Sequence, residues 1–485
     1  MRKSRETSLR NPFNRMEPPM PSEYEATDTL GRAMFGHAQL GDRRRSERLV
    51  TTFEQMRRHP GGTLPDKMSS PADLKGLYRL CHCEAVTHAA LIAAMRIYTL
   101  ARIAAHDGQV LVVHDATELD YTSLGSLAED LGQIGKGTHR GYLCHNVIAL
   151  DATTGAVLGL LDQILHCRDD VPDDETLTEL RERDTRESLL WLRGAGQLPG
   201  DPRLIDVADQ GASTFEFLEH ETHSGRRFVI RNGKIRKVHA GHTAVGRTHY
   251  LKEYVQSLPE LGRFTMDVQA QKGRKARRAA EFTVRGGPVL LLRPHARCGR
   301  HGDDPLPLYV VYVLEVKPPR GEKPIEWMLL TNEPVRTFDD AWRVVGWYER
   351  RWVVEEYHKA LKTGCQIEDL QFTAVERLQP AIALLSAVAL TLLNLRDASR
   401  RHDAQTRRAT TLFAREYVEV LNAWRHGKVR CDLTVHDFFL ALARLGGHQN
   451  RKRDHRPGWL ILWRGWTKLQ CMLDGYHAAQ RTKCG

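Results

Sequence analysis

The amino-acid sequence predicts a multidomain α/β protein whose two ends are helical and whose middle is rich in strands. Residues 23–105 repeat apolar side chains at helical spacing, and most of 376–478 does the same. Between these segments, short apolar runs bounded by turn residues indicate β-strands. With 485 residues, the chain is long enough for roughly three domains.

The strand-rich middle opens with a predicted meander of three strands. Residues 110–114 form a buried-strand run that ends on Asp115, and two further apolar runs, 141–150 and 156–165, are joined by the turn-forming sequence of a hairpin. A later strand, 204–208, ends on a second aspartate. Two strands are therefore each expected to deliver an acidic side chain at the carboxyl end.

The rest of the middle segment changes character twice. Residues 176–192 predict a helix before the later strand. From 226 to 330, strand-like runs enclose a basic segment, 272–278, and a long amphipathic helix is predicted over 339–363.

The charge of the chain favours a polyanionic partner. Lys and Arg number 71 against 60 Asp and Glu, which gives a formal net charge of +11. A membrane is not expected as a partner, because no apolar run approaches the roughly 18 residues of a spanning helix. Residues 1–10 are polar and lack the apolar core of a secretory signal.

Cysteine usage indicates a reducing compartment. Nine cysteines are scattered between Cys81 and Cys484, too sparsely for a disulfide framework, and a cytoplasmic location is expected. The cluster of Cys81, His82 and Cys83 has no second ligand pair with which to close a tetrahedral zinc site. No metal is therefore expected at that cluster.

The segment 347–364 predicts a helix with two distinct faces. At about 100° per residue, Tyr348, Arg351, Glu355 and Lys362 share an arc of about 60°, and apolar side chains occupy the opposite arc. Glu355 would then face outward among cations able to hold phosphates, as a DNA-cutting site requires. The alternative is a solvated helix face with an ordinary i,i+4 ion pair between Arg351 and Glu355. The helix by itself leaves both interpretations open.

Three acids, Asp115, Asp209 and Glu355, follow the layout of RNase H-like metal nucleases: two at strand ends and one on a helix after a long insertion. Phosphodiester cleavage needs an activated attacking oxygen and a stabilised leaving oxygen, which two Mg²⁺ ions about 4 Å apart supply. Hard cations of this kind prefer carboxylate oxygens. Asp120 and Asp206 are the nearest rivals, and a lone aspartate at a strand end is more often a turn or capping residue.

A four-position motif carries a family resemblance. Tyr348-x2-Arg351-x3-Glu355-x6-Lys362 resembles the signature of the insertion-sequence-four family of bacterial cut-and-paste transposases. Other stretches resemble the same family: 40–49 and 77–79 its DNA-binding segment, 114–117 and 208–211 its first two catalytic blocks, 140–161 its strand meander, and 459–475 its C-terminal region. The sequence departs from one member that it resembles at Gln210, where that member has arginine, and its N-terminal lead is longer.

The resemblance implies roles for the matched residues. It implies that the divalent ions, two Mg²⁺ with Mn²⁺ as a substitute, are held by Asp115, Asp209 and Glu355. It implies that Trp327 stacks on a base flipped out of a DNA hairpin. The full set of implied DNA contacts is Tyr348, Arg351, Lys362, Arg231, Trp327, Arg44, Arg45 and Arg48.

The resemblance also implies an organisation and a reaction. The expected parts are a flexible lead 1–22, a helical DNA-binding domain 23–105, an RNase H-like core 106–225 and 332–375, a β-rich insertion 226–331, and a helical dimerisation domain 376–485. Water would free a 3′ hydroxyl at each transposon end. That hydroxyl would form a hairpin with the opposite strand, a second water would open the hairpin, and the end would then join target DNA. The implied partners are double-stranded DNA, both transposon ends and target, and a second copy of the chain in a paired-end complex associated with the bacterial nucleoid.

Two other classes of function stay open at this point. One is a domesticated DNA-binding protein that no longer cuts, although the intact acids and Lys362 argue against it. The other is a plain RNase H-like nuclease that cuts without joining. The recognised end sequence and the target preference cannot be read from the residues.

Overall fold

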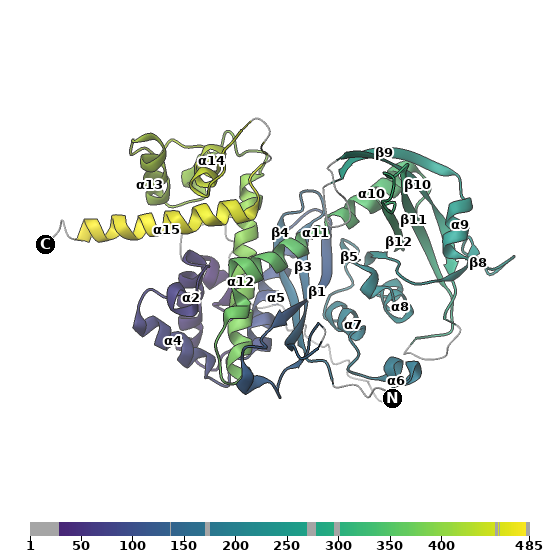
Figure 1. Cartoon of the computed structure of the whole chain (residues 1–485), viewed down its shortest axis with the longest axis horizontal. Coiled ribbons are helices and arrows are strands. Elements are labelled where there is room, and N and C mark those ends of the chain that lie inside the picture. Colours follow the sequence, from purple (N-terminus) through teal and green to yellow (C-terminus); the bar gives the residue numbers. More distant parts are fainter. Residues whose placement is uncertain are drawn as a thin grey trace, which may run out of the picture.

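The computed structural model describes residues 29–135, 137–169, 175–268, 278–294, 301–451, 454 and 456–481. The predicted lead 1–22 and the basic residues 272–277 lie outside the described residues. The chain forms a mixed α/β structure built on one large sheet, with helices on both faces (Figure 1). This agrees with the α/β class predicted from the sequence.

Within the described residues, twelve strands form the sheet. They are β1 (Val110–Asp120), β2 (Gly132–Gln133), β3 (Arg140–Asp151), β4 (Val157–His166), β5 (Leu204–Ala208), β6 (Arg227–Arg231), β7 (Lys237–Ala240), β8 (His249–Tyr250), β9 (Glu260–Val268), β10 (Arg278–Leu291), β11 (Leu306–Val316) and β12 (Glu326–Thr331). Their order is β2-β3-β1-β5-β6-β12-β11-β10-β7-β8, with β4 on β3 and β9 on β10. Strand β6, at the start of the predicted insertion 226–331, pairs in parallel with β5, so the insertion continues the same sheet.

The predicted meander and the later strand are present, with one difference. Strands β1 and β5 pair in parallel from Val110 opposite Leu204 to His114 opposite Ala208. Strand β1 does not end at Asp115, as the sequence suggested, but continues to Asp120. The reason is that β3 pairs with β1 along its whole length in antiparallel register, which supplies hydrogen bonds after β5 has ended.

Helices cover both faces of this sheet. The helices are α1 (Thr29–Phe35), α2 (Arg43–Arg58), α3 (Leu64–Lys67), α4 (Pro71–Cys81), α5 (His88–Ala104), α6 (Leu177–Glu182), α7 (Leu189–Ala195), α8 (Phe215–His223), α9 (Leu251–Ser257), α10 (Phe338–Glu349), α11 (Trp352–Lys359), α12 (Val375–Ser399), α13 (Arg415–His426), α14 (Val435–Leu445) and α15 (Trp459–Arg481). Alternate residues of β1 face opposite layers: Leu111 and Val113 join the core cluster with α5, α10, α11 and α12. Buried side chains of α7, α8 and α9 form a separate cluster with other strand residues of the sheet.

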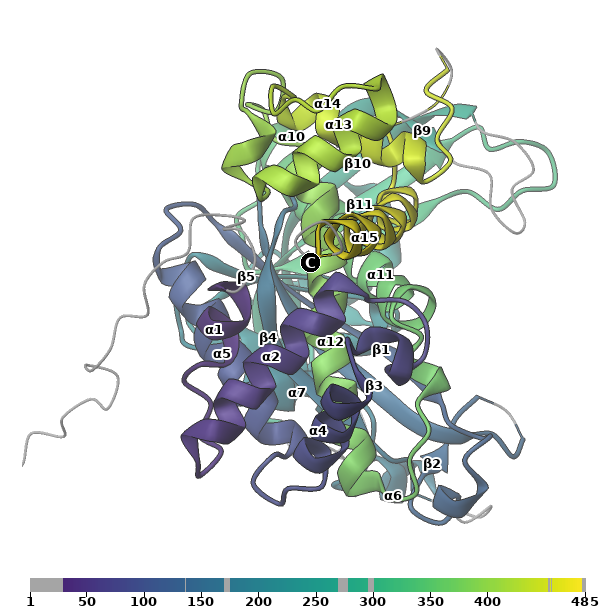
Figure 2. The same ribbon diagram turned by 90° about the vertical axis from the view of Figure 1, so that its left-hand side faces the viewer.

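The helices α1 to α5 confirm the helical prediction for the described part of 23–105. Asp42 caps α2 by accepting from the Arg44 N–H, and Ser70 caps α4, which begins with a proline. Helix α12 lies between α2 and α4 on one side and strands β3 and β4 on the other (Figures 1 and 2). The N-terminal helices and the sheet therefore share one core.

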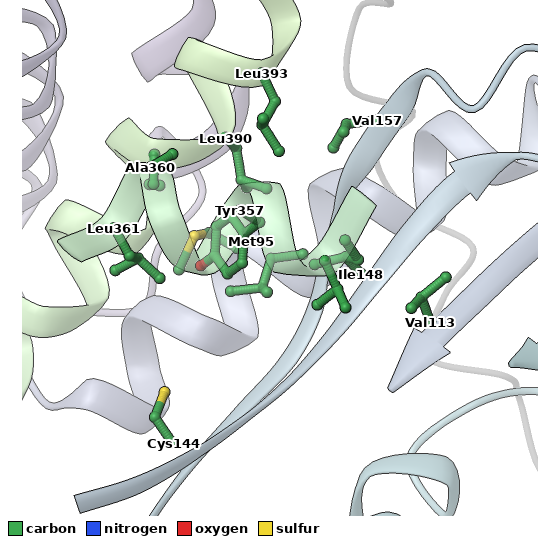
Figure 3. Packing of buried hydrophobic residues seen from close by; sticks show 14 of the residues in the cluster. Met95, Val113, Cys144, Ile148, Val157, Tyr357, Ala360, Leu361, Leu390 and Leu393 are labelled. Atoms are coloured by element: carbon green, nitrogen blue, oxygen red, sulfur yellow. The ribbon is translucent and has the colours of Figure 1, made fainter. Parts of the chain in front are cut away.

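The side chains of α12 show how this core is filled. In Figure 3, Met95 of α5, Tyr357 of α11 and Leu390 of α12 gather beside Ile148 of β3. Helix α12 is long and apolar enough to cross a membrane, which corrects the expectation that the chain has no such run. However, 89% of its apolar window is buried inside the protein, as in the central helix of a globular core.

Two predicted helices are interrupted. The helix expected over 176–192 is two short helices, α6 and α7. The helix expected over 339–363 breaks after α10, where the Arg351 N–H bonds the Tyr348 carbonyl in a tight turn. It resumes as α11 and ends in a π-helical turn, Ala360–Gly364, where the Cys365 N–H reaches the Ala360 carbonyl. Each change of turn size shifts the phase of the side chains that follow.

Candidate active site

Two of the predicted acids directly follow the parallel-paired segments of neighbouring strands, and the third lies on a helix that packs against β1. Asp115 and Asp209 are the residues that follow the last parallel pair of β1 and β5. Asp115 shares the alternation of Leu111 and Val113, so it faces α11, which carries Glu355. Asp209 caps a short 3₁₀ turn, and its Oδ1 accepts from the Gly211 N–H at 2.8 Å.

Arg351 links two of these acids. Its Nη1 donates to Asp115 Oδ2 at 2.7 Å, and its Nη2 donates to Glu355 Oε1 at 2.6 Å. The side chains of Arg351 and Asp115 are each 15% exposed. The i,i+4 pair considered in the sequence is therefore present, but Arg351 also bonds the largely buried Asp115, while the Glu355 side chain is 37% exposed.

The charges of Asp209 and Glu355 act on Asp115, although burial has the largest effect on its pKa. Burial raises the pKa of Asp115 to about 6, Arg351 opposes this rise, and the carboxylates of Asp209 and Glu355 add to it. Burial is therefore the largest cause of the raised pKa, and each acidic neighbour adds less to it than Arg351 opposes it. A buried carboxyl group with a perturbed pKa beside other charged groups is typical of functional sites.

The donor set fits a hard divalent cation in chemical type, since all three groups are carboxylates. Among the described residues, however, no three His, Cys, Asp or Glu side chains converge closely enough to hold a metal ion. The guanidinium of Arg351 stands between Asp115 and Glu355 and supplies the positive charge there. Metal ligation by these acids therefore requires Arg351 to move away from Asp115.

The raised pKa of Asp115 predicts a pH-dependent stability difference. The folded pKa of Asp115, about 6, exceeds its unfolded value near 4. The stability that this carboxyl group contributes is therefore fully present below about pH 4 and is lost as pH rises through about 6. Asp115→Asn does not titrate, so above pH 6 it should unfold about 1–3 kcal/mol less readily than the unmodified protein, without metal or DNA. Urea unfolding at pH 4 and pH 8 checks this, and an equal stability difference at both pH values would contradict it.

An aromatic and basic group adjoins the acids. Tyr348 is buried, its ring packs edge-on against Trp327 at 5.6 Å between centroids, and Arg351 lies 6.0 Å from the ring. Burial raises the pKa of the Tyr348 phenol, while Arg351 and the hydrogen-bonded Arg231 oppose the rise and Asp209 adds to it. The structure thus brings Tyr348, Trp327 and Arg231 to the site. Tyr348 was expected on the exposed arc, and the turn at Arg351 explains its burial.

Lys362 has a different environment from the one the helical projection suggested. Its Nζ pairs with Glu368 Oε1 at 3.0 Å, and the same oxygen accepts from the Asp120 N–H at 2.9 Å. The π-helical turn around Lys362 changes its phase relative to Glu355. Its predicted contact with phosphate stays a prediction.

Asp206 and Asp120, the alternatives to the predicted acids, make other interactions. Asp206 is fully buried and pairs with His114 at 2.7 Å and with Arg226 at 2.6 Å. Asp206 lies within β5, whereas Asp209 follows the end of the strand and caps the next turn. Asp120 accepts from the Thr122 hydroxyl at 2.6 Å in a turn, as a lone strand-end aspartate commonly does.

The predicted N-terminal arginines lie on α2, away from the acids. The Arg44 side chain is 87% exposed and pairs with Asp42 at 2.9 Å. Arg48 pairs with Asp73 at 3.4 Å, and Arg45 donates to the Leu40 carbonyl at 2.8 Å. Arg44 and Arg48 are thus each paired with an aspartate, and their predicted contact with DNA stays a prediction. Of the basic segment 272–278, Arg278 is described, and it pairs with Glu315 and Glu322.

The sequence interpretation missed a group of buried polar side chains beside the acids. Asn146 and Gln163 interrupt the apolar runs of β3 and β4, and His358 follows Glu355 by three residues. All three are buried and hydrogen-bonded to one another in series. Polar residues inside otherwise apolar strand runs were the available signal.

The comparison with known families points to DNA. Residues 31–86, which span α1 to α4, match the family of transposase DNA-binding domains. The match includes Arg44, Arg45 and Arg48 and the predicted segments 40–49 and 77–79. It supports a DNA transposase in general terms and DNA as a binding partner.

Proposed function

We propose that this chain is a metal-dependent cut-and-paste DNA transposase of the insertion-sequence-four family, with Asp115, Asp209 and Glu355 as its catalytic acids. The observation that carries the proposal is the link that Arg351 makes between Asp115 of β1 and Glu355 of α11, in a chain whose residues 31–86 match transposase DNA-binding domains. The four motif residues Tyr348, Arg351, Glu355 and Lys362 support the family assignment.

The strand order supports an RNase H-like core. The five strands β4-β3-β1-β5-β6 are neighbours in the sheet, and of these only β3 runs antiparallel to the rest. The first acid lies on the opening strand, the second after β5, and the third on a helix after the insertion. This is the layout in which such nucleases hold their acids.

In the proposed strand cleavage, the acids, the arginines and the tyrosine have different roles. When bound, two Mg²⁺ ions would activate the attacking oxygen and stabilise the leaving oxygen, and Asp115, Asp209 and Glu355 would hold them. Arg351, freed from Asp115, is placed to bind a phosphate of the cut strand through two N–H groups. Tyr348 and Arg231 border the same site and can orient the DNA backbone.

The arrangement of the DNA-binding helices supports a paired complex. Helix α2 and the acidic site lie on opposite sides of α12 (Figure 1). A DNA end held by α2 of one protomer can therefore be cut by the acids of a second protomer. In this proposal two copies of the chain hold two transposon ends, free a 3′ hydroxyl at each, form hairpins and join the ends to target DNA.

A cleavage assay tests the proposal. Purified protein is incubated with end DNA from its own element and Mg²⁺, and products are separated on a denaturing gel. We expect a nick first, then a hairpin, then joined product when target DNA is added. Nicks without hairpins would indicate a plain nuclease, and binding without nicks would indicate a DNA-binding protein that no longer cuts.

A further inference from the structure

A row of polar side chains crosses the sheet beneath α11. In the strand registers, Asp115 of β1 lies opposite Asn146 of β3, and Asn146 lies opposite Gln163 of β4. Directly opposed residues of antiparallel strands point to the same face, so these three side chains form one row. Asn146 is 0% exposed and Gln163 is 3% exposed. Buried polar groups of this kind destabilise the fold unless they are hydrogen-bonded.

The hydrogen bonds of this row form a continuous chain with a defined direction. Gln163 Nε2 donates to Asn146 Oδ1 at 2.8 Å, and Asn146 Nδ2 lies 3.1 Å from His358 Nε2 on α11. At the other end, Gln163 Nε2 also donates to Ser386 Oγ of α12 at 2.9 Å, and Gln163 Oε1 lies 3.0 Å from His88 Nε2 of α5. This series of hydrogen bonds therefore joins α11, strands β3 and β4, α12 and α5.

The hydrogen bond with Asn146 determines which ring nitrogen of His358 carries the proton. The Asn146 amide nitrogen is a donor, so His358 Nε2 must accept, and the imidazole must be neutral with its proton on Nδ1. Burial lowers the pKa of His358 to about 3, and the positive charges of Lys362 and Arg351 lower it further. A neutral ring with one acceptor nitrogen matches the single amide donor that it meets.

Helix α11 packs on the sheet through the buried side chains of Val354 and Tyr357 as well as through His358. A tight turn separates it from α10, and it runs directly into the π-helical turn Ala360–Gly364. Glu355 and His358 are three residues apart and share one side of α11. The helix thus places Glu355 near Asp115 and His358 against Asn146, along the same row.

We propose that Asn146 and His358 are positioning residues of the acidic site: their hydrogen bond fixes α11 on the sheet so that Glu355 faces Asp115 and Asp209. This inference rests on the proposed DNA-cutting function. Neither residue touches the reacting atoms. A misplacement of about 1 Å at a catalytic group can lower a rate by about a hundredfold. Loss of this bond should therefore slow cleavage with little effect on the affinity for end DNA, because residues 31–86, which match transposase DNA-binding domains, do not include Asn146 or His358.

The test compares two replacements of His358 in the full-length protein. His358→Gln keeps an acceptor oxygen for Asn146, whereas His358→Leu removes it. Single-turnover nicking of end DNA per folded molecule should fall about ten- to a hundredfold in His358→Leu and in Asn146→Leu. The rate should stay within about threefold of the unmodified protein in His358→Gln. The dissociation constant for end DNA should not change in any of them.

A matched control separates positioning from general loss of stability. Thr391 is a buried polar residue of α12 whose hydroxyl donates to the Val388 carbonyl, so it takes no part in the hydrogen bonds between Gln163, Asn146 and His358. Thr391→Val should lower the melting temperature without changing the nicking rate of the folded fraction. If His358→Leu behaves like Thr391→Val, or if His358→Gln loses as much rate as His358→Leu, the inference is wrong.

A spectroscopic reading keeps the inference testable apart from activity. Nitrogen NMR of labelled histidine should show His358 as the Nδ1–H tautomer at pH 7. In Asn146→Asp, the new carboxylate should instead draw a proton onto Nε2 and raise the pKa of His358. An Nε2–H tautomer in the unmodified protein would overturn the inference. If the unmodified protein fails to nick end DNA at all, the proposed function fails, and the tautomer still reports on the hydrogen-bond chain.

Discussion

Replacing any one of the three acids by its amide should reduce nicking of transposon-end DNA at least about a thousandfold. The variants are Asp115→Asn, Asp209→Asn and Glu355→Gln. In the proposed site the three carboxylates hold two cations together, so the loss of one charge weakens the hold on both. A loss of about 4 kcal/mol in transition-state stabilisation corresponds to roughly that factor. Quantified denaturing gels measure it.

Two neighbouring acids provide controls. Asp120 lies on the same strand as Asp115 but bonds Thr122 in a turn, and Glu356 adjoins Glu355 but pairs with Arg396. Asp120→Asn should nick at a rate close to that of the unmodified protein, and Glu356→Gln should do so once corrected for folded fraction. All variants should bind end DNA, because 31–86 are unchanged. Near-normal nicking by Asp209→Asn, for example, would remove that residue from the site.

Replacement of Trp327 should affect hairpin formation and leave the first nick nearly intact. The indole is partly buried and lies edge-on to Tyr348, beside the acids. A tight strand reversal is relieved when one base flips out, at a cost of a few kcal/mol, and an aromatic platform returns about 1–3 kcal/mol of this. Trp327→Ala should therefore slow the hairpin step by roughly ten- to a hundredfold. Pre-nicked end DNA isolates that step.

The contrast with other aromatic changes makes this prediction specific. Trp327→Phe keeps a stacking surface and should retain most of the rate. Trp342 is 40% exposed on α10 and packs against Phe264, so Trp342→Ala should not change the hairpin rate. An unpaired base at the flipped position should partly rescue Trp327→Ala. Normal hairpin formation by Trp327→Ala, or its failure to fold, would assign the indole to the core.

Much of the fold was predictable because local sequence patterns indicate several of its strands. The runs that became β3, β4 and β5 are short, apolar and bounded by turn residues, and β5 has the predicted limits, Leu204–Ala208. The limits of β1 were not predictable, since its second half is held by pairing with β3 and not by its own apolar residues. The break before α11 was also not predictable, because no glycine or proline marks it.

The acids of the site were easier to find than their surroundings. Asp115 and Asp209 follow strand runs directly, and Glu355 stands in a spaced motif. The direction of Tyr348 and the pairing of Lys362 with Glu368 depend on the phase of the helix, which changes at turns that the sequence does not mark. The row of polar residues beside Asp115 depends on strand register, and register is a tertiary property.

A change of metal preference would show whether Asp115 is a ligand. Thiolates favour softer cations than carboxylates do, so Asp115→Cys should lose nicking with Mg²⁺ and recover part of it with Mn²⁺. Asp120→Cys is the control and should keep the metal preference of the unmodified protein. The measurement is the ratio of nicking rates with Mn²⁺ and Mg²⁺ on end DNA. We expect this ratio to rise at least about tenfold for Asp115→Cys, a difference of about 1.4 kcal/mol. An unchanged ratio would contradict the assignment of Asp115 to the metal-binding site.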